Sequence, residues 1–509
     1  MFDNNNNNNK EEKSSKNRNV NSKEPKKNHE NNWIDDLSNS NDFISYTTSP
    51  DEDHYYCISF YQTLVSTEIQ HNQVFPILTK NLTLEELKSQ IPIQQLIITS
   101  DSSIIKSKLL QGFMAIQYQN NKNECLLVNV ENNFSRTIGP PLMESTTLGP
   151  QVGFVEDIDV NINLIRKKLP ITDLHLKELT VGELSKTRVA VIHLNGIADE
   201  DNLQTVTQRI KDIQYDHISD SSYISTMIGD NTSSIFPQSI PTERIDRAVA
   251  GLTEGKIVIV VDGSPNLILT PALIDETIIA MEDYYVNWVL ATFFRLLRIF
   301  GLTLAVFITP LYVAVLTYHY ELIPPQLLES LVSSRASVPF PPIIEVLFLE
   351  ITIELVKEAG LRLPSKIGQT LGIVGGIVIG QAVVEAKLTS NILLIFVGLG
   401  TLASYTSAIY KFNNTIRFLR FPVILMSQFI GLLGIFMSFI FLIAHLLRLT
   451  SLGRPYLGSY PYRKTAIYDL WIRLPFSKQT KNPTSLRPNK KYRSTSDIKR
   501  PGPPSDFDE

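Results

Sequence analysis

The sequence has almost no cysteine and none of the common motifs for nucleotide or metal chemistry. Cys57 and Cys125 are the only cysteines in 509 residues, and two distant cysteines predict ordinary thiols in a reducing compartment rather than a disulfide framework. Residues 251–256 (GLTEGK) have the wrong spacing for a Walker A loop. The 8 histidines do not cluster, and no HExxH motif occurs. We therefore expect no catalytic residues, no metal and no cofactor, and hence no enzyme.

The N-terminus has no apolar secretory signal and is rich in Asn, Lys and Ser instead. Residues 1–50 bury too little apolar surface to offset the entropy cost of ordering, so we expect a disordered tail there. The first apolar run that is long enough to insert into a membrane begins near residue 289. The residues before it are expected to remain in the cytoplasm.

Short apolar segments alternate with amphipathic ones after this tail, which is typical of an α/β region. We expect one small subdomain over residues 51–135. Within it, residues 82–90 are predicted to form a helix capped by Thr83. Residues 114–118 and 125–130 are predicted to form paired strands.

A connector over residues 136–188 and a second small subdomain over residues 189–280 are expected to follow. In the connector, residues 157–168 have acidic side chains first and basic ones last, as a helix dipole favours. The second subdomain reads as strand, two helices, strand, turn and strand. The corresponding segments are residues 189–194, 199–213, 242–253, 256–261 and 266–269.

The last third of the chain holds four apolar stretches, each near the roughly 20 residues that a helix needs to cross a bilayer. They are residues 299–318, 367–386, 388–410 and 421–447. We expect a membrane domain over residues 299–449, preceded by an interfacial helix over residues 281–298 and followed by a basic cytoplasmic tail over residues 450–509. The predicted fold class is an α/β soluble N-terminal half with two small subdomains, followed by an all-α helical membrane domain.

A fifth segment, residues 339–364, is apolar but carries several charges. Glu350, Glu354 and Glu358 are four residues apart, so they lie along one helix face. Charges at membrane depth are costly and usually face a protein interior or water. The segment is therefore an amphipathic helix lying flat at the interface, a re-entrant or water-lining helix, or a plain lipid-facing span.

The second apolar stretch has a glycine at every fourth position. These glycines are Gly368, Gly372, Gly376 and Gly380. Such a stripe of small residues lets helix backbones approach closely. Close helix packing accounts for it, and a glycine face that also flanks a narrow pore is the alternative. Glu385 adds an acidic group to the same stretch.

The distribution of basic residues gives two conflicting signals about topology. The basic tail favours a cytoplasmic C-terminus and therefore an even number of spans, so four full spans would fit if residues 339–364 do not cross. That arrangement places Lys411, Arg417 and Arg420 outside, against the same rule. A five-span arrangement places that loop in the cytoplasm but the C-terminal tail outside. We therefore expect four full spans plus a re-entrant or interfacial helix over residues 339–364. The tail has the composition to contact anionic lipid, and nucleic acid is not expected as a partner.

Four stretches of the sequence resemble one known family. Residues 339–390 are similar to the membrane core of the A subunits of GerA-type spore germinant receptors, and the resemblance extends over roughly residues 50–475. The other three stretches that look like this family are residues 139–168, 236–266 and 281–285.

The resemblance implies a multi-pass protein of the inner spore membrane that triggers germination. It implies a permease-like B subunit that binds the nutrient, a lipoprotein C subunit, and homo-oligomerisation into a nutrient-gated cation channel. Acidic rings favour cations, so the pore or gating candidates are Glu350, Glu354, Glu358 and Glu385. Two alternatives stay open: an A-like paralogue from the dipicolinate-release operon, and a non-conducting scaffold of the receptor complex.

Overall fold

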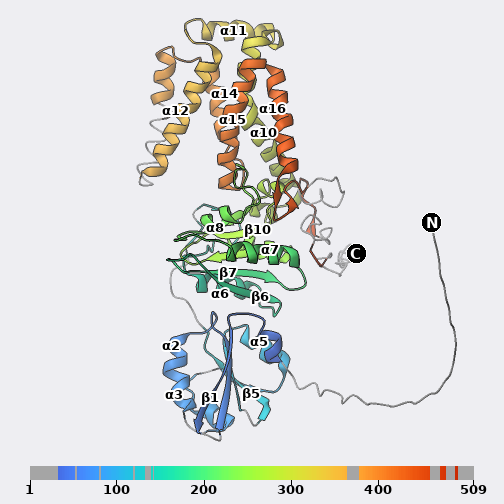
Figure 1. Cartoon of the computed structure of the whole chain (residues 1–509). Coiled ribbons are helices and arrows are strands. Elements are labelled where there is room, and N and C mark those ends of the chain that lie inside the picture. The colour runs from blue at the N-terminus through green and yellow to red at the C-terminus, as the bar shows by residue number, and fades with distance from the viewer. Residues whose placement is uncertain are drawn as a thin grey trace, which may run out of the picture.

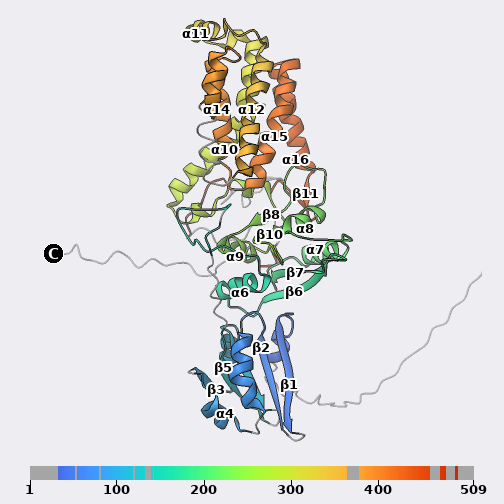
Figure 2. The same cartoon turned by 90° about the vertical axis from the view of Figure 1, so that its left-hand side faces the viewer.

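The computed structural model describes most of the chain, from residue 33 to residue 490. The positions within those limits that it does not describe are residues 52–53, 80–81, 94, 119–120, 132–138, 142, 364–375, 377, 459–470 and 477–487. The described part has two α/β subdomains and a helical bundle, stacked in chain order along one axis (Figures 1 and 2).

The first subdomain is an antiparallel sheet with helices on both faces. Its strand order is β1-β2-β4-β5-β3. The strands are β1 (Phe43–Asp51), β2 (His54–Tyr61), β3 (Leu96–Thr99), β4 (Phe113–Tyr118) and β5 (Asn121–Asn129). The helices are α1 (Trp33–Leu37), α2 (Thr67–Ile69), the π-helix η1 (Gln70–Val74), α3 (Phe75–Leu78), α4 (Leu84–Gln90) and α5 (Ser102–Leu109).

Alternate residues of this sheet bury two separate cores, as the period of two along a strand requires. Ile116 and Leu126 pack with α4 on one face, whereas Ala115 and Leu127 pack with α1 and α5 on the other. The predicted helix over residues 82–90 is confirmed: Thr83 caps α4 and makes a reciprocal capping box with Glu86. The predicted strand pair is confirmed as β4 and β5.

The prediction of a disordered tail to residue 50 is wrong over its last part, because α1 and β1 lie within it. The strand is an edge strand with a largely polar sequence, yet it is held by pairing with β2 and by a buried contact at its start. Asp42 Oδ1 lies 2.7 Å from Arg166 Nη2, and both side chains are only 1% exposed. A carboxylate removed from water must be paired in this way, so residue 42 belongs to the folded domain.

The second subdomain repeats the same plan with the strand order β6-β7-β9-β10-β8. Its strands are β6 (Leu174–Val181), β7 (Thr187–Leu194), β8 (Ile240–Thr242), β9 (Ile257–Val261) and β10 (Leu267–Thr270). Its helices are α6 (Ile158–Lys168), α7 (Glu200–Lys211), α8 (Ser221–Met227) and α9 (Ile245–Thr253). The connector is therefore structured: it supplies α6, whose predicted dipole arrangement is confirmed by the N-cap Asp157, and the edge strand β6.

The helical part begins with two short 3-10 turns and ends in a small hairpin. The turns are η2 (Ile274–Thr277) and η3 (Met281–Tyr284), and a third, η4 (Tyr320–Leu322), follows the first long helix. The helices are α10 (Trp288–Tyr318), α11 (Pro325–Arg335), α12 (Pro342–Arg362), α14 (Asn391–Ala403), α15 (Tyr410–Ile430) and α16 (Leu432–Arg448). The hairpin pairs β11 (Thr450–Ser451) with β12 (Arg454–Pro455).

Two of the predicted helix boundaries in this half are corrected. The predicted interfacial helix over residues 281–298 is not a separate element, because α10 begins at Trp288 and continues without a break to Tyr318. The predicted fourth apolar stretch is wrong as one helix, because α15 and α16 meet at Gly431. Gly431 has φ +63°, a left-handed conformation that glycine adopts without strain.

Helices α10, α12, α14, α15 and α16 pack side by side, and α11 lies across the end farthest from the α/β half (Figures 1 and 2). Of the helices in the described part, only α10 combines the length and the apolar composition needed to cross a bilayer. Helices α14 and α16 are apolar but shorter.

The bundle and the second subdomain share one apolar cluster. Ala248 of α9 belongs to it together with Val306 of α10 and Ile416 of α15. The two parts therefore pack against each other through a shared apolar interior.

Candidate functional site

The acidic residues predicted on one helix face do lie together on α12, and two of them face α15. Glu350 Oε2 lies 2.6 Å from Arg420 Nη1, and both side chains are 2% exposed. One helical turn further, Glu354 Oε2 lies 3.1 Å from Arg417 Nη1 at a more exposed position. The predicted row of carboxylates is thus matched by a row of guanidinium groups on α15.

Arg420 holds four helices at one point. Its Nε donates to the carbonyl oxygen of Ala305 on α10 at 2.8 Å, and its Nη2 donates to the carbonyl oxygen of Gly400 on α14 at 2.9 Å. Its Nη1 donates to Glu350 on α12. A side chain at position 400 would collide with Ile308, since an added Cβ would lie 2.9 Å from its Cγ2. Glycine at position 400 therefore lets α14 approach this centre without displacing Ile308.

The Glu350 carboxylate is only half satisfied. Its Oε2 makes the ion pair, whereas its Oε1 is fully buried and makes no hydrogen bond of normal geometry, although the buried Thr309 hydroxyl of α10 lies close to the carboxylate. A buried polar atom without a partner is costly. The pair therefore joins the helices at a site that is not optimised for stability.

The other predicted candidates lie nearer the surface. Glu358 pairs with Arg362 of the same helix at 2.8 Å, and both side chains are mostly exposed. Glu385 is exposed and, among the described residues, has no ion-pair partner. Neither is brought to the Glu350–Arg420 centre.

The glycine stripe is only partly within the described residues. Gly368 and Gly372 lie outside them. A Cβ at Gly376 would meet nothing within 4 Å, and one at Gly380 would lie 3.8 Å from Leu394. Packing against the described residues therefore does not require glycine at these two positions, and the close approach of helix backbones along the stripe stays a prediction.

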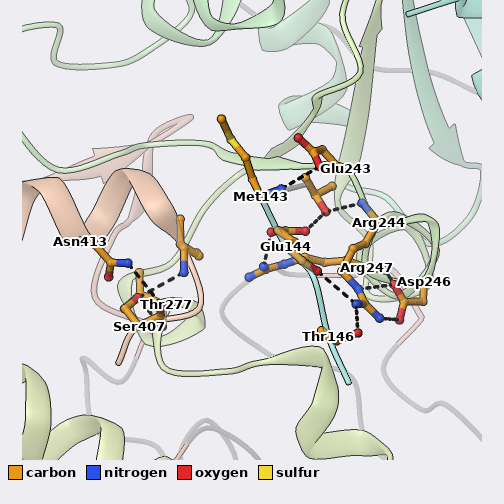
Figure 3. A network of polar contacts seen from close by, with 12 residues as sticks. Met143, Glu144, Thr146, Glu243, Arg244, Asp246, Arg247, Thr277, Ser407 and Asn413 are labelled. Atoms are coloured by element: carbon orange, nitrogen blue, oxygen red, sulfur yellow. Dashed lines mark hydrogen bonds and ion pairs between the residues drawn. The ribbon is translucent and has the colours of Figure 1, made fainter. Parts of the chain in front are cut away.

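A second polar cluster lies where the second subdomain meets the bundle (Figure 3). Its centre is Arg244, 2% exposed, whose Nη2 lies 2.6 Å from Asp246 Oδ2. The same guanidinium donates to Thr146 and to the carbonyl oxygen of Glu144. Arg247 Nη1 in turn lies 2.8 Å from Glu144 Oε1. The segment around residue 144 is thereby fixed to the first turn of α9.

This junction cluster reaches the start of α10 through a tyrosine. Tyr285 Oη donates to Asp246 at 2.7 Å. Burial disfavours the Asp246 carboxylate, but hydrogen bonds from Arg244 and Tyr285 outweigh this and lower its pKa. Burial, followed by the hydrogen bond to Asp246, raises the pKa of Tyr285 to about 12. Asp246 is therefore an ionised carboxylate that accepts a hydrogen bond from the neutral phenol of Tyr285.

A third contact fixes α10 itself. Asp283, 1% exposed, accepts from Arg295 Nε at 3.1 Å and from Arg298 Nη2 at 2.7 Å. These two arginines, which lie in the segment predicted as an interfacial helix, thus hold α10 to η3. Helix α10 continues from there to Ala305, the carbonyl that binds Arg420. A single helix therefore connects the junction cluster to the Glu350–Arg420 centre.

Sequence reasoning missed Arg420, Arg244 and Asp283 as site residues. Arg420 and Arg417 were counted as loop charges, although both lie inside α15. Their spacing of three residues complements the four-residue spacing of Glu350 and Glu354 and is the signal that was available. The junction residues lie in stretches singled out above for their resemblance, but no spacing relates them because they are far apart in sequence.

Comparison with known proteins gives consistent matches over most of the chain. A family model described as Bacillus/Clostridium GerA spore germination protein matches residues 31–485. The spore germination protein GerIA of Bacillus cereus is 49% identical over 459 residues, covering 90% of this chain and 69% of that protein. YfkQ of Bacillus subtilis (strain 168), named an uncharacterized membrane protein, is 36% identical over 400 residues, covering 78% of each.

Among solved structures, one match is the N-terminal domain of the A subunit of the Bacillus megaterium spore germinant receptor GerK3. It covers 47% of this chain and 92% of that chain, with 22% identity and a TM-score of 0.34.

Proposed function

The chain belongs to the GerA family of spore germination proteins, and from this premise we propose that it is a membrane subunit of a receptor that starts spore germination in response to nutrients. Its relatives are named as germination proteins and not as enzymes, so the chain is not an enzyme. We place it in the inner membrane of the spore as a multi-pass protein. Its proposed partners are a permease-like B subunit, a lipoprotein C subunit and further copies of itself.

The arrangement of the bundle supports a topology with both ends of the chain in the cytoplasm. Helix α10 leaves the second subdomain, and α16 returns to it, where Thr450 and Gly453 bind Asp230. The loop before α15 also lies on this side, because Ser407 Oγ donates to the carbonyl oxygen of Thr277. Lys411 then lies on the cytoplasmic side, in agreement with the positive-inside rule.

The observation that carries the proposed mechanism is the buried pair Glu350–Arg420. An ion pair among apolar helices adds little net stability, because desolvation offsets its Coulomb attraction. Charges in such places generally serve a function. We therefore propose that the pair is the closed-state latch of a ligand-gated cation channel, and that opening separates α12 from α15 and exposes Glu350 to water.

In this proposal the other acidic candidates attract cations along the opened path. Glu354 is partly exposed and shares its arginine with Asn414. Glu358 and Glu385 are exposed on the outer part of the bundle. Carboxylates at such positions raise the local cation concentration.

A non-conducting scaffold is the second candidate, and one observation favours it. Glu350 is already neutralised by Arg420 within one chain, so a row of free acidic groups is not present at that point. In a scaffold the pair would only join helices, and conduction would occur elsewhere in the receptor.

The decisive experiment reconstitutes the purified A–B–C complex in planar bilayers and adds nutrient. The channel proposal expects cation currents whose gating changes in Glu350→Gln, whereas Glu358→Ala keeps wild-type gating and changes only the conductance. Currents that are identical in the two variants, or a complex that never conducts, favour the scaffold. If spores with the variants germinate normally but release dipicolinate slowly, the chain is instead the paralogue from the dipicolinate-release operon.

A further inference from the structure

An apolar pocket of about 720 Å³ lies between α10, α15 and α16, next to the second subdomain. Its walls are formed mainly by aliphatic, aromatic and methionine side chains, including Val423, Met426, Met437 and Phe441. The volume is within the range of about 300–1,000 Å³ that is typical of ligand sites. Nothing in the proposed gating mechanism uses this pocket.

The polar groups of the pocket gather at one end. Ser234 Oγ and His445 Nε2 lie 3.1 Å apart there, beside Ser233. Ser438, further along the wall, uses its hydroxyl to donate to Gly434 of its own helix. The pocket is therefore amphipathic along its length, with its polar end toward the second subdomain.

The length of the pocket matches one leaflet of a bilayer. From His445 to Met437 the chain advances eight residues along α16, which corresponds to about 12 Å of helix. Half of a hydrocarbon core is about 15 Å thick. A pocket that starts at the second subdomain would thus extend from the membrane surface toward the midplane.

A smaller polar pocket of about 170 Å³ adjoins the polar end and shares Ser234 and Phe236 with it. It is lined by hydroxyl and amide groups and by Lys411. These groups provide hydrogen-bond donors and one cation, which is the chemistry that binds an anionic headgroup.

We propose that the two pockets together bind one anionic phospholipid from the leaflet on the side of the α/β half. An acyl chain occupies the apolar pocket, and the headgroup lies near Lys411 and Ser234. This rests on the proposed membrane insertion. A transmembrane helix of a partner is a poorer occupant, because a helix is about 10 Å across and 720 Å³ would contain only about 9 Å of it, fewer than two turns.

The bound lipid would contact the same helix as the latch. Leu419, Val423 and Met426 of α15 line the pocket, and Arg417 and Arg420 reach α12 from an adjoining face of the same helix. A lipid that fills the space between α10, α15 and α16 would restrict movement of α15 away from α12. Anionic lipid is therefore expected to favour the closed latch.

The test uses the full-length protein in nanodiscs that contain phosphatidylglycerol with a photoactivatable acyl chain, followed by mass spectrometry of the labelled peptides. We expect label at Met426 and Met437. In Ala444→Trp, which fills the pocket, labelling there should fall about tenfold. Leu402→Trp, on an exposed apolar face of α14, is the matched control and should label as wild type. Lys411→Gln should lose the preference for phosphatidylglycerol over phosphatidylcholine.

Three results would overturn the lipid site. The first is labelling spread evenly over the exposed apolar helices, and the second is an equal loss of pocket labelling in the two tryptophan variants. The third is displacement of the label from Met437 by the B subunit, which would make a partner helix the occupant. Failure of the proposed function is distinguished separately. If the wild-type chain is extracted from spores without detergent, membrane insertion itself is wrong. If extraction needs detergent but the label is spread evenly over the exposed helices, only the lipid site is wrong.

Discussion

Replacing Glu350 by Gln would remove the charge from the proposed latch while keeping the shape of the side chain. Arg420 would retain the carbonyl oxygens of Ala305 and Gly400 but lose its only carboxylate within the described residues. Removing one partner of a buried pair costs about 3–5 kcal/mol. Because Gln keeps a hydrogen-bond acceptor, we expect a cost at the lower end of this range, about 3 kcal/mol. A free-energy change of about 1.4 kcal/mol corresponds to a tenfold change in an equilibrium constant.

If the pair exists only in the closed state, that free energy is lost from the closed state alone. The equilibrium between closed and open forms should then shift toward open by about 100-fold. Spores that carry Glu350→Gln in place of their own copy should release potassium and lose optical density without nutrient. Ion release from washed spores, followed over time without and with nutrient, measures this directly.

Glu358→Gln is the matched control, because it removes the same charge from the same helix at an exposed pair. Exposed pairs contribute about 0–1 kcal/mol, so this variant should stay closed without nutrient, as wild type does. A double variant, Glu350→Gln with Arg420→Gln, should be affected less than the sum of the single changes if the two residues are coupled. The latch is refuted if Glu350→Gln spores need nutrient as wild-type spores do and the purified variant melts at the same temperature as Glu358→Gln.

Three further changes test other parts of the structure. Gly434→Ala places a Cβ 2.1 Å from the carbonyl oxygen of Met426. It should lower the free energy of unfolding by about 1–3 kcal/mol, which a lower melting temperature would show. Gly398→Ala, whose added Cβ would have no atom within 4 Å, is the control. Burial lowers the pKa of His193 to about 4 from 6.5, so between these pH values the unfolded chain binds more protons than the folded one. The free energy of unfolding should therefore fall by up to about 3 kcal/mol as pH drops from 6.5 to 4. Melting temperatures measured over this pH range should change less in His193→Gln than in wild type. Asp246→Asn breaks the buried contact with Arg244, so spores should lose the nutrient response although immunoblots show normal amounts of membrane-bound protein.

The local parts of the fold were predictable because their signals are local. A capping threonine and its glutamate lie three residues apart in α4, and an aspartate precedes α6 with lysines at its end. Such patterns are complete within a dozen residues, so the sequence alone specifies them.

The missed elements depend on partners that are distant in sequence. Strand β1 belongs to the sheet through β2 and through Arg166, which is 124 residues away from Asp42. Strand β6 is an edge strand that pairs with β7 and was placed in a connector. Neither has the continuous apolar run that marks a central strand, so composition assigned them to irregular structure.

The division between α15 and α16 was missed for a different reason. Hydropathy averages composition along the chain, and the turn at Gly431 lies between Ile430 and Leu432, without a polar residue to interrupt the run. The turn is specified by backbone conformation instead, because Gly431 takes φ +63° and Gly434 lets the next turn approach Met426. A hairpin of this kind has no signal on a hydropathy scale.

The conflict over topology was a consequence of the same missed pairing. Arg417 and Arg420 had been counted as loop charges, but both lie inside α15 and pair with carboxylates of α12. Charges that are neutralised within a bundle carry no information about sidedness, since the positive-inside rule applies to loops.

The order of the pairs is reversed, Glu350 with Arg420 and Glu354 with Arg417, which is possible only if the two helices are antiparallel. Helix α12 has 21 residues and is about 31 Å long, so an antiparallel partner of α15 is long enough to cross a bilayer. We propose that α12 crosses the bilayer with its charges paired to α15, and we expect a cysteine at Ile344 to be labelled from the opposite side of the membrane to one at Leu361. Labelling of both from the same side would remove the crossing and with it the proposed latch.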